Sequence, residues 1–493
     1  MHRTRYRATT TSGVFALLLL AFAGPGQAQV PVAEYAERRA ALAQEIGDGI
    51  VLGMGSAAPP FDYLLFFQNS PFRYLTGLTE PDGALVLIVE GGRVTAETLF
   101  VNRRDPAVET WEGYRVGVEG VEGAHGLPGR AADELEHVVD SLLSGRPRVL
   151  HVVGPYAPDA EILNDVTQRV EAVRAGNRDV PVENANDVVA GLRAVKSDAE
   201  LDLLRRSTAI TVQAHREALG AVAPARNEFE VQALIEYTFR RYGAERSAFA
   251  SIVGSGPNST VLHYNANDRF MEDGDVVVMD IGASYEGYAA DITRTLPVNG
   301  RFSDAQRDIY QLVRDAQSAA EEVAGPGVSR DLLSQAATRV LAEGLARLGL
   351  IEGPAATFDG PDGNPLPQLL LYYMHGLGHG TGLDVHDPWP SVLEPGVVFT
   401  IEPGVYVRAN LFSEVVPDTP ANRRMQEAVA EVFERYVNIG VRIEDDYIVT
   451  ADGLQRISPA PREIEEIEAA MAEDWTHPEA RNQEWVEWYR GMR

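Results

Sequence analysis

Two aspartates, Asp280 and Asp291, stand out because they interrupt an otherwise apolar hairpin pattern. The stretches 275–283 and 288–295 are rich in β-branched residues and flank a glycine-containing turn, which predicts two antiparallel strands. The two aspartates are almost equally far from the turn, so the pattern places them opposite each other on one face. Two buried carboxylates side by side need a counter-charge, and a divalent metal ion is the simplest one. The alternative is a pair of strand-end aspartates in surface turns.

A second feature is the glycine-rich segment 375–387, which holds three of the ten histidines of the chain: His375, His379 and His386. Four glycines lie between the first and the last of them, which disfavours a helix and predicts an extended segment or loop. The spacing of four residues is therefore not the helical arrangement of zinc proteases. A lone histidine usually has a structural role, but three in such a segment predict a functional site.

Two glutamates further along the chain complete a possible metal-binding set. Glu402 and Glu444 each follow an apolar β-branched residue, as expected near a strand end. Together with two aspartates and one histidine they form an oxygen-rich set that suits two hard or borderline divalent ions, with carboxylates bridging them. Two ions about 3.5 Å apart can share a hydroxide and polarise a scissile carbonyl, which is hydrolytic chemistry.

Helices and strands in two groups would position these residues. Residues 35–46 and 131–143 have helical patterns and 49–54, 84–89 and 149–153 strand patterns, which predicts an α/β unit with its own core. Long helical periodicity begins at residue 198, so we place a domain boundary near 195. We predict an α/β (α+β) protein with domains at 29–195 and 196–470. The predicted helices of the second domain are 198–219, 228–242, 304–324 and 329–348.

An aromatic-rich tail is predicted after the second domain, at 471–493. It follows an acidic amphipathic helix predicted at 463–471. We expect its aromatic cluster to pack against the body of the protein or against a second subunit. The cluster comprises Trp475, Trp485, Trp488 and Tyr489.

Composition narrows the class of protein. The chain has 493 residues, of which 45% are hydrophobic and 23% charged, which is typical of a globular protein with more than one domain. The net charge of −29 argues against nucleic acid and anionic membranes as partners. Cysteine is absent, which excludes disulfides, thiolate metal sites and a cysteine nucleophile.

The first residues of the chain have the pattern of a secretory signal peptide. Three arginines within the first seven residues precede a short apolar run, 14–23, and small residues lead to a candidate cleavage site after Ala28. We therefore expect residues 1–28 to be removed and the mature protein to be exported, periplasmic or secreted, with no stable membrane anchor. An uncleaved anchor is the alternative.

The ordered motifs that carry the two aspartates, the histidine and the two glutamates resemble those of the pita-bread metallopeptidases, and within them aminopeptidase P and prolidase. They are Met279-Asp280-Ile281-Gly282, Ala290-Asp291-Ile292-Thr293-Arg294-Thr295, His375-Gly376-Leu377-Gly378-His379, Ile401-Glu402-Pro403-Gly404 and Arg442-Ile443-Glu444-Asp445. The N-terminal motifs Tyr74-Leu75-Thr76-Gly77 and Glu80-Pro81 resemble the leading domain of the same family. The resemblance implies an N-terminal α/β creatinase/aminopeptidase-P-type domain followed by a pita-bread catalytic domain.

The resemblance also implies a metal ligand set. Asp280 would bind one ion, His379 and Glu402 would bind the other, and Asp291 and Glu444 would bridge the two. The usual metal of the family is manganese, although cobalt or zinc can occupy such sites.

Further residues acquire catalytic roles by the same resemblance. Glu402 would accept the proton of the metal-held water, and Arg442 would support a ligand carboxylate. Three histidines would orient the substrate and stabilise the developing charge on the peptide carbonyl: His263, His375 and His386.

The substrate implied by the resemblance is a peptide with proline in the second position, from which the N-terminal residue is released. The metal ligands do not separate this activity from that of a prolidase, which takes only dipeptides and in some relatives also attacks phosphoesters. A metal-free, peptide-binding pita-bread module is a remote alternative, because all five ligands are present. We also expect a homo-oligomer, either a dimer or a tetramer.

Two departures from the family pattern carry expectations of their own. Gly380 stands where relatives often have a bulky aromatic residue, which would widen the pocket. An apparent insertion at 411–434 has a partly helical pattern and would reshape the entrance or an oligomer interface.

Overall fold

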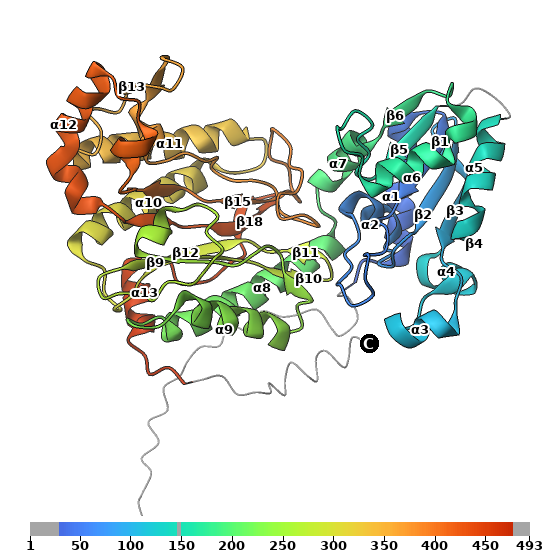
Figure 1. The fold of residues 1–493 in the computed structure, drawn as a ribbon, viewed down its shortest axis with the longest axis horizontal. Helices are drawn as coiled ribbons and strands as arrows, with labels where there is room; N and C mark the ends of the chain where they lie inside the picture. The colour runs from blue at the N-terminus through green and yellow to red at the C-terminus, as the bar shows by residue number, and fades with distance from the viewer. Residues whose placement is uncertain (1–28, 145–148, 477–493) are drawn as a thin grey trace, which may run out of the picture.

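The computed structural model describes residues 29–144 and 149–476. The predicted leader, 1–28, and the tail residues Trp485, Trp488 and Tyr489 lie outside this range. Within it, no helix combines the length and the apolar character needed to cross a membrane. Two lobes of mixed α/β structure lie side by side (Figure 1), which confirms the predicted α/β (α+β) fold class.

The N-terminal lobe is built on a six-stranded mixed sheet with the order β4-β3-β2-β1-β5-β6. Strands β1, β2 and β3 are antiparallel neighbours, whereas β4, β5 and β6 join the sheet in parallel. The strands are β1 (Gly49–Met54), β2 (Ala84–Glu90), β3 (Arg93–Val101), β4 (Gly129–Ala131), β5 (Leu150–Val153) and β6 (Val182–Asn184).

Both faces of this sheet are covered by helices, because alternate residues of its central strands point to opposite sides. Val51 packs in a core with side chains from α1 (Val32–Ile46), α2 (Ser70–Thr76), α4 (Gly117–His125) and α7 (Asn186–Ala194). Leu52, the next residue, packs in a second core with α5 (Leu135–Ser144) and α6 (Asp165–Val173). The remaining helix of this lobe, α3 (Pro106–Glu112), contributes no buried residue.

The linker between the lobes is short and its far end is fixed by a helix cap. Helix α7 ends at Ala194 and α8 (Asp198–Ala221) starts after Ser197. The Ser197 hydroxyl accepts from the Glu200 amide while the Glu200 carboxylate accepts from the Ser197 amide, which is a capping box. The predicted boundary at residue 195 lies in this linker.

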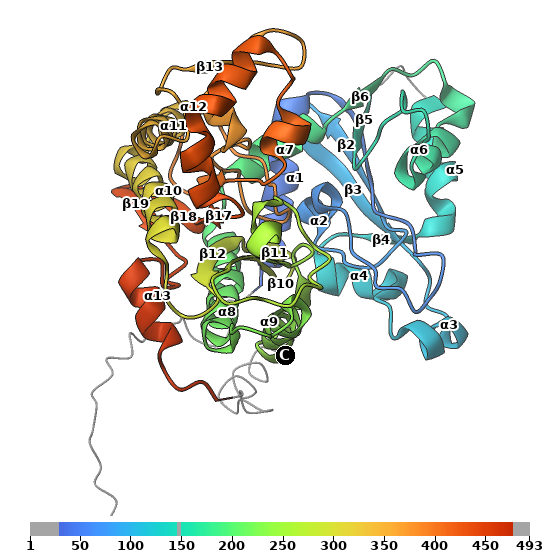
Figure 2. The ribbon, with the colours of Figure 1, turned by 60° about the vertical axis from the view of Figure 1, so that its left-hand side comes forward.

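The C-terminal lobe places short antiparallel strands between two pairs of helices, as Figures 1 and 2 show. Helices α8 and α9 (Glu228–Arg241) lie on one side, and α10 (Asp304–Val323) and α11 (Arg330–Leu348) on the other. The strands that matter for the site are β9 (Val276–Ile281), β12 (Ile292–Pro297), β15 (Val398–Ile401), β17 (Gly440–Arg442) and β18 (Asp445–Thr450). A single large core joins them to the helices.

Smaller elements complete this lobe. The remaining strands are β7 (Arg246–Ser247), β8 (Ile252–Ser255), β10 (Ala283–Tyr285), β11 (Tyr288–Ala289), β13 (Thr357–Asp359), β14 (Pro365–Pro367), β16 (Gly404–Tyr406) and β19 (Gly453–Arg456). Two further helices lie in the C-terminal part of this lobe: α12 (Pro420–Tyr436), between β16 and β17, which fits the helix expected within 411–434, and α13 (Ile464–Met471), after β19. Beyond α13, Trp475 packs on α8 at Gly220, and the other three residues of the predicted aromatic cluster lie outside the described residues.

The predicted hairpin is present, but its register was predicted wrongly. Asp280 is paired with Thr293, and Asp291 lies just before β12. The chain bends at Gly282, where an added Cβ would lie 1.9 Å from the Ala290 carbonyl oxygen. Strands β10 and β11 therefore belong to a separate sheet with β7. The two aspartates are diagonal neighbours on one face instead of direct partners.

Candidate active site

All nine residues predicted to form the site line one pocket of about 560 Å³ in the C-terminal lobe. Further lining residues, among them Phe249 and Asn265, were not predicted, since nothing in their local sequence marks them. The predicted residues are His263, Asp280, Asp291, His375, His379, His386, Glu402, Arg442 and Glu444. Their individual roles stay predictions.

The ends of four strands bring the acidic residues together. Asp280 lies in β9, and Asp291 immediately precedes β12, its antiparallel partner. Glu402 follows β15, and Glu444 precedes β18, which pairs with β15 through Ile401 and Asp445. Asp280 is part of its ladder, paired with Thr293 of β12 and Ile252 of β8, whereas the other three acids lie just outside their strands. The two strand pairs therefore bring the four carboxylates together.

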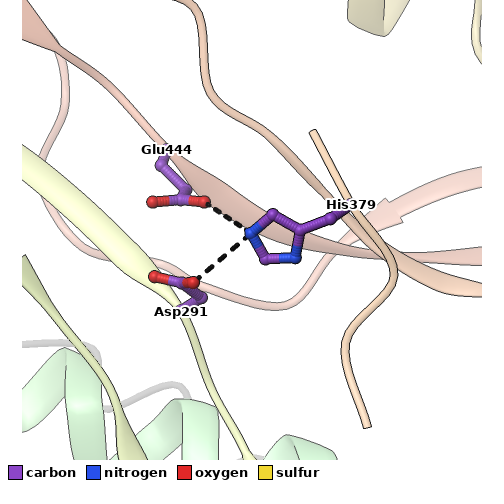
Figure 3. A group of neighbouring side chains, drawn as sticks. All are labelled: Asp291, His379 and Glu444. Carbon is purple, nitrogen blue, oxygen red and sulfur yellow. Dashed lines mark ion pairs between the residues drawn. The ribbon is translucent and has the colours of Figure 1, made fainter. Parts of the chain in front are cut away.

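His379 enters the pocket from the glycine-rich segment, which contains no helix, as predicted. Its Nδ1–H donates to the Gly380 carbonyl at 3.0 Å, which leaves the Nε2 lone pair free. That nitrogen lies 3.5 Å from an Asp291 oxygen, 3.6 Å from Glu402 and 3.9 Å from Glu444. Figure 3 shows the Asp291 and Glu444 carboxylates pointing at the ring nitrogen. A bare lone pair facing carboxylates is unfavourable unless a cation lies between them.

Two of the carboxylates use one oxygen for the protein and leave the other without a partner. Arg442 Nη2 donates to Asp280 Oδ2 at 2.5 Å, and the Thr293 hydroxyl donates to Glu444 Oε2 at 2.7 Å. Among the described residues, Asp280 Oδ1, Asp291 Oδ1 and Glu444 Oε1 are buried without a hydrogen-bond partner. Buried polar atoms are normally paired, so these oxygens are available to a ligand.

The acidic residues disfavour one another's charged form. The pKa of Glu402 is raised to about 8, mainly by burial; nearby Arg442 opposes this rise and nearby Asp280 adds to it. Burial and then Glu444 raise the pKa of Asp291 well above its usual range, and burial and then Glu402 do the same for Glu444. Among the described residues that line the pocket, only Arg442 has a permanent positive charge. The site therefore has a deficit of positive charge.

Divalent metal ions fit this donor set. Carboxylate oxygens and one imidazole nitrogen converge, and ligand atoms of Asp291, His379 and Glu444 lie within 4.8 Å of one another. Burial lowers the pKa of His379 to about 4, so its imidazole is neutral, as a metal ligand requires. Bound cations would supply the missing charge and would engage the unpaired oxygens.

The other histidines surround this group. His375 Nδ1–H donates to the Gly376 carbonyl at 2.8 Å, and its Nε2 lies 2.9 Å from the Tyr406 hydroxyl. Burial lowers the pKa of His375 to about 4. Tyr406 also accepts from Arg442 at 2.9 Å, and it was not predicted, because its role depends on the pairing of β16 with β17. The ring centroids of His386 and His379 are 4.2 Å apart.

The expectation that Gly380 widens the pocket is wrong. Gly380 does not line the pocket but bridges to Asp387 and Phe399. A Cβ at this position would lie 2.4 Å from the Asp387 carbonyl oxygen, so the backbone leaves no room for a side chain. Glycine is required here by the close approach of two chain segments.

Comparison with known proteins agrees with the fold and the pocket. Residues 202–451 match the family described as metallopeptidase family M24, and residues 35–151 match the N-terminal domain of aminopeptidase P. The chain is 34% identical to the Xaa-Pro aminopeptidase of Escherichia coli K12 over 453 residues, covering 89% of this chain and 97% of that protein. It is 33% identical to the human Xaa-Pro dipeptidase over 486 residues, covering 90% of this chain and 94% of that protein.

Solved structures give the same result. Zinc-substituted E. coli aminopeptidase P in complex with product superposes with a TM-score of 0.76 at 32% identity, covering 90% of this chain and 98% of that one. An aminopeptidase of Pseudomonas aeruginosa superposes with a TM-score of 0.75 at 33% identity, covering 90% of this chain and 99% of that one. Fold, pocket and comparisons together define a two-domain metalloaminopeptidase. The chain belongs to metallopeptidase family M24, in its aminopeptidase P and prolidase group, and its C-terminal lobe is the pita-bread domain.

Proposed function

We propose that the protein releases the N-terminal residue from peptides with proline in the second position, and that two divalent ions, Mn²⁺ in the native enzyme, support the reaction. Co²⁺ or Zn²⁺ would be alternative ions. The observation that carries the proposal is the pocket that four carboxylates share with the neutral imidazole of His379, three of these carboxylates each having a buried oxygen without a partner. The choice of substrate is supported by the Xaa-Pro aminopeptidase relative at 34% identity.

The ligand assignment is the one that the family resemblance implies, and the unpaired oxygens of the pocket support it. Asp280 would hold one ion, His379 and Glu402 the other, and Asp291 and Glu444 would be shared. Two bound ions would supply the nucleophile, a hydroxide shared between them, and would polarise the scissile carbonyl. The contact from Arg442 to Asp280 orients that carboxylate and leaves Oδ1 for the ion.

The proton and the substrate are handled by the chain's own residues. Glu402 lies with one oxygen 3.6 Å from His379 Nε2 and the other 3.8 Å from His375 Nδ1, within the pocket. It takes the proton of the attacking water and passes it to the leaving amine. His263, His375 and His386 line the same pocket, where they orient the peptide and stabilise charge on its carbonyl oxygen.

The test is hydrolysis of two substrates by the metal-reconstituted protein: an Xaa-Pro dipeptide and a longer peptide that begins Xaa-Pro. Manganese-dependent release of the first residue from the longer peptide, abolished by chelation, is the expected result. Cleavage of the dipeptide alone would identify a prolidase instead, the second candidate, which the dipeptidase relative at 33% identity favours. If metal-loaded protein cleaves neither peptide, both the aminopeptidase and the prolidase proposals are overturned. Phosphoester hydrolysis or peptide binding without catalysis would then remain as functions.

We further propose that the protein is exported after cleavage behind Ala28, without a stable membrane anchor, and that it assembles into a dimer or tetramer. The basic start and short apolar run of residues 1–28 support export. N-terminal sequencing of the protein from the periplasm or medium should begin at Gln29. Light scattering on the same sample measures the mass, and the mass of a single processed chain, which is below the 53.7 kDa of the full sequence, would contradict the assembly.

A further inference from the structure

A buried ion cluster joins the interdomain linker to the loop that carries the histidines. Lys196 Nζ lies 2.8 Å from Asp387 Oδ2, and both side chains are 1% exposed. Arg193, near the end of α7, donates to the other Asp387 oxygen and also to Asp384 Oδ2 at 2.6 Å. Ser70 of α2 donates to Asp384 Oδ1 at 2.6 Å. The N-terminal lobe and the linker thus hold one short segment of the catalytic lobe by three side chains.

That segment, residues 380–387, is a closed loop. Asp387 N–H donates to the Gly380 carbonyl at 2.8 Å, which joins the two ends of the loop. The Asp387 carboxylate points back into the loop, where its Oδ1 accepts from the Asp384 amide at 3.1 Å. It leaves no space at Gly382, where a Cβ would lie 2.5 Å from Asp387 Oδ2. The carboxylate is therefore the internal support of the loop.

The loop sets the positions of two pocket residues. His379 directly precedes Gly380, and His386 directly precedes Asp387. Because Gly380 and Asp387 are hydrogen-bonded, the two imidazoles are held together, with ring centroids 4.2 Å apart. Any displacement of Asp387 moves His386 relative to His379.

We propose that Lys196 and Arg193 are positioning residues for the reaction: they hold Asp387 and thereby fix His386 in the pocket. Neither residue lies within the matched family M24 segment, which starts at residue 202. The positive charges of Lys196 and Arg193 are both needed, because a buried carboxylate without them is destabilised, and the loop would shift to expose Asp387 to solvent. The inference rests on the proposed peptidase function, and it makes the linker a functional part of the catalytic site.

The test combines kinetics with a double-mutant cycle. Lys196→Met keeps the length of the side chain but removes its charge, and it should lower kcat by about tenfold to 100-fold because His386 is misplaced. KM and manganese content should stay near the wild-type values. In the His386→Ala background the same substitution should change kcat little, because the residue through which it acts is gone. Independent, multiplicative losses in the two backgrounds would overturn the proposal.

A second readout does not depend on peptidase activity. Hydrogen exchange of the amides in 380–387 should be faster in Lys196→Met than in the wild type, since Asp387 closes the loop. Arg205→Met is the matched control, because Arg205 is 41% exposed and pairs with exposed Asp202, so neither kcat nor loop exchange should change. Unchanged loop exchange in Lys196→Met contradicts the inference. If exchange is faster in Lys196→Met but the wild-type enzyme has no peptidase activity, only the proposed function is contradicted. If Lys196→Met does not fold, Lys196→Met/Asp387→Asn, which removes both charges, carries the same test.

Discussion

At the scale of single residues, the pocket is defined by a mismatch of charge. Four acidic side chains, Asp280, Asp291, Glu402 and Glu444, share the pocket with one guanidinium, that of Arg442. No second arginine or lysine among the described residues lines the pocket, and three buried oxygens of these four side chains have no hydrogen-bond partner. Such an arrangement destabilises the metal-free fold and is favourable only with cations bound.

Asp291→Ala should abolish both metal binding and hydrolysis. Asp291 is buried, and its carboxylate is the one directed at His379 Nε2 at the shortest distance, 3.5 Å. Metal content measured by mass spectrometry should fall from about two ions per chain to a small fraction of that. Asp202→Ala, at an exposed aspartate, should change neither quantity. Normal activity of carefully demetallated and reconstituted Asp291→Ala would refute the ligand assignment.

His375→Ala should lower turnover while metal content stays near normal. The imidazole contacts Gly376 and Tyr406 and lies beside the carboxylate group without pointing a free nitrogen at it. We expect a loss of roughly 100-fold in kcat, typical of a residue that assists charge stabilisation or proton transfer. A parallel loss of bound metal would show that the residue supports the ligands instead.

The stability of the metal-free protein should fall as pH rises from about 6.5 to about 8. Burial raises the pKa of Glu402 to about 8 in the folded state, whereas an unfolded glutamate titrates near 4.3. The folded state therefore binds a proton that the unfolded state lacks, and the free energy of unfolding decreases through this window. His375 and His379, whose pKa values are lowered to about 4, act in the opposite sense, but only below about pH 6.5.

Thermal unfolding in chelator at several pH values checks this prediction. Glu402→Gln should make the decline shallower, because the variant has no proton to lose at that position, whereas Asp291 and Glu444, whose pKa values are also raised, still contribute. Manganese should reverse the trend, since ligand carboxylates must be ionised to bind it. Equal slopes for the wild type and Glu402→Gln would contradict the assignment of the decline to this residue.

At the scale of elements, the segment before His379 depends on close backbone pairing with β15. The Thr400 amide donates to the His379 carbonyl at 2.9 Å, and the Glu402 amide donates to the Leu377 carbonyl at 2.8 Å. This pairing places an imidazole and a carboxylate of the site on adjacent chain segments. Gly378 lies between the two hydrogen bonds, where a Cβ would be 2.0 Å from the Thr400 carbonyl oxygen.

Gly378→Ala should therefore separate His379 from Glu402 and weaken metal binding. The clash is with backbone, so it cannot be relieved by a rotamer change, and overpacking of this kind costs about 1–3 kcal/mol. We expect lower manganese affinity by calorimetry together with a lower Tm. Gly376→Ala, in the same segment, is the matched control because its added Cβ has no described heavy atom within 4 Å apart from its neighbours in the chain. Equal manganese affinity in the two variants would contradict this account.

The sequence predicted the elements better than their mutual register. The ligand motifs could be found because metal chemistry requires carboxylates and imidazole, which are unusual beside apolar strand residues. The pairing of Asp280 with Thr293 could not be found, because the bend at Gly282 depends on the approach of Ala290 from the other strand. Tyr406 was missed for the same reason, since its partners come from distant segments.

At the scale of the whole molecule, the two lobes are joined by buried charged contacts as well as by the linker. Arg38 of α1 lies 3.2 Å from Glu200 of α8, with side chains 5% and 4% exposed. Glu200 also accepts from the Tyr288 hydroxyl at 3.0 Å and caps its own helix. Removal of one partner from such a buried pair leaves the other charge buried and uncompensated, which typically costs about 3–5 kcal/mol. The contact should therefore make the two lobes unfold together.

Arg38→Met tests this coupling. The wild-type protein should melt in one transition that manganese shifts upward as a whole, because the ion binds only the folded state. In Arg38→Met the N-terminal lobe should separate as an earlier transition that manganese does not move, while the catalytic lobe still responds to the ion. Arg205→Met, which breaks an exposed pair worth about 0–1 kcal/mol, should keep the single transition. A single manganese-sensitive transition in Arg38→Met would mean that the linker and the ion cluster at Asp387 suffice to couple the lobes.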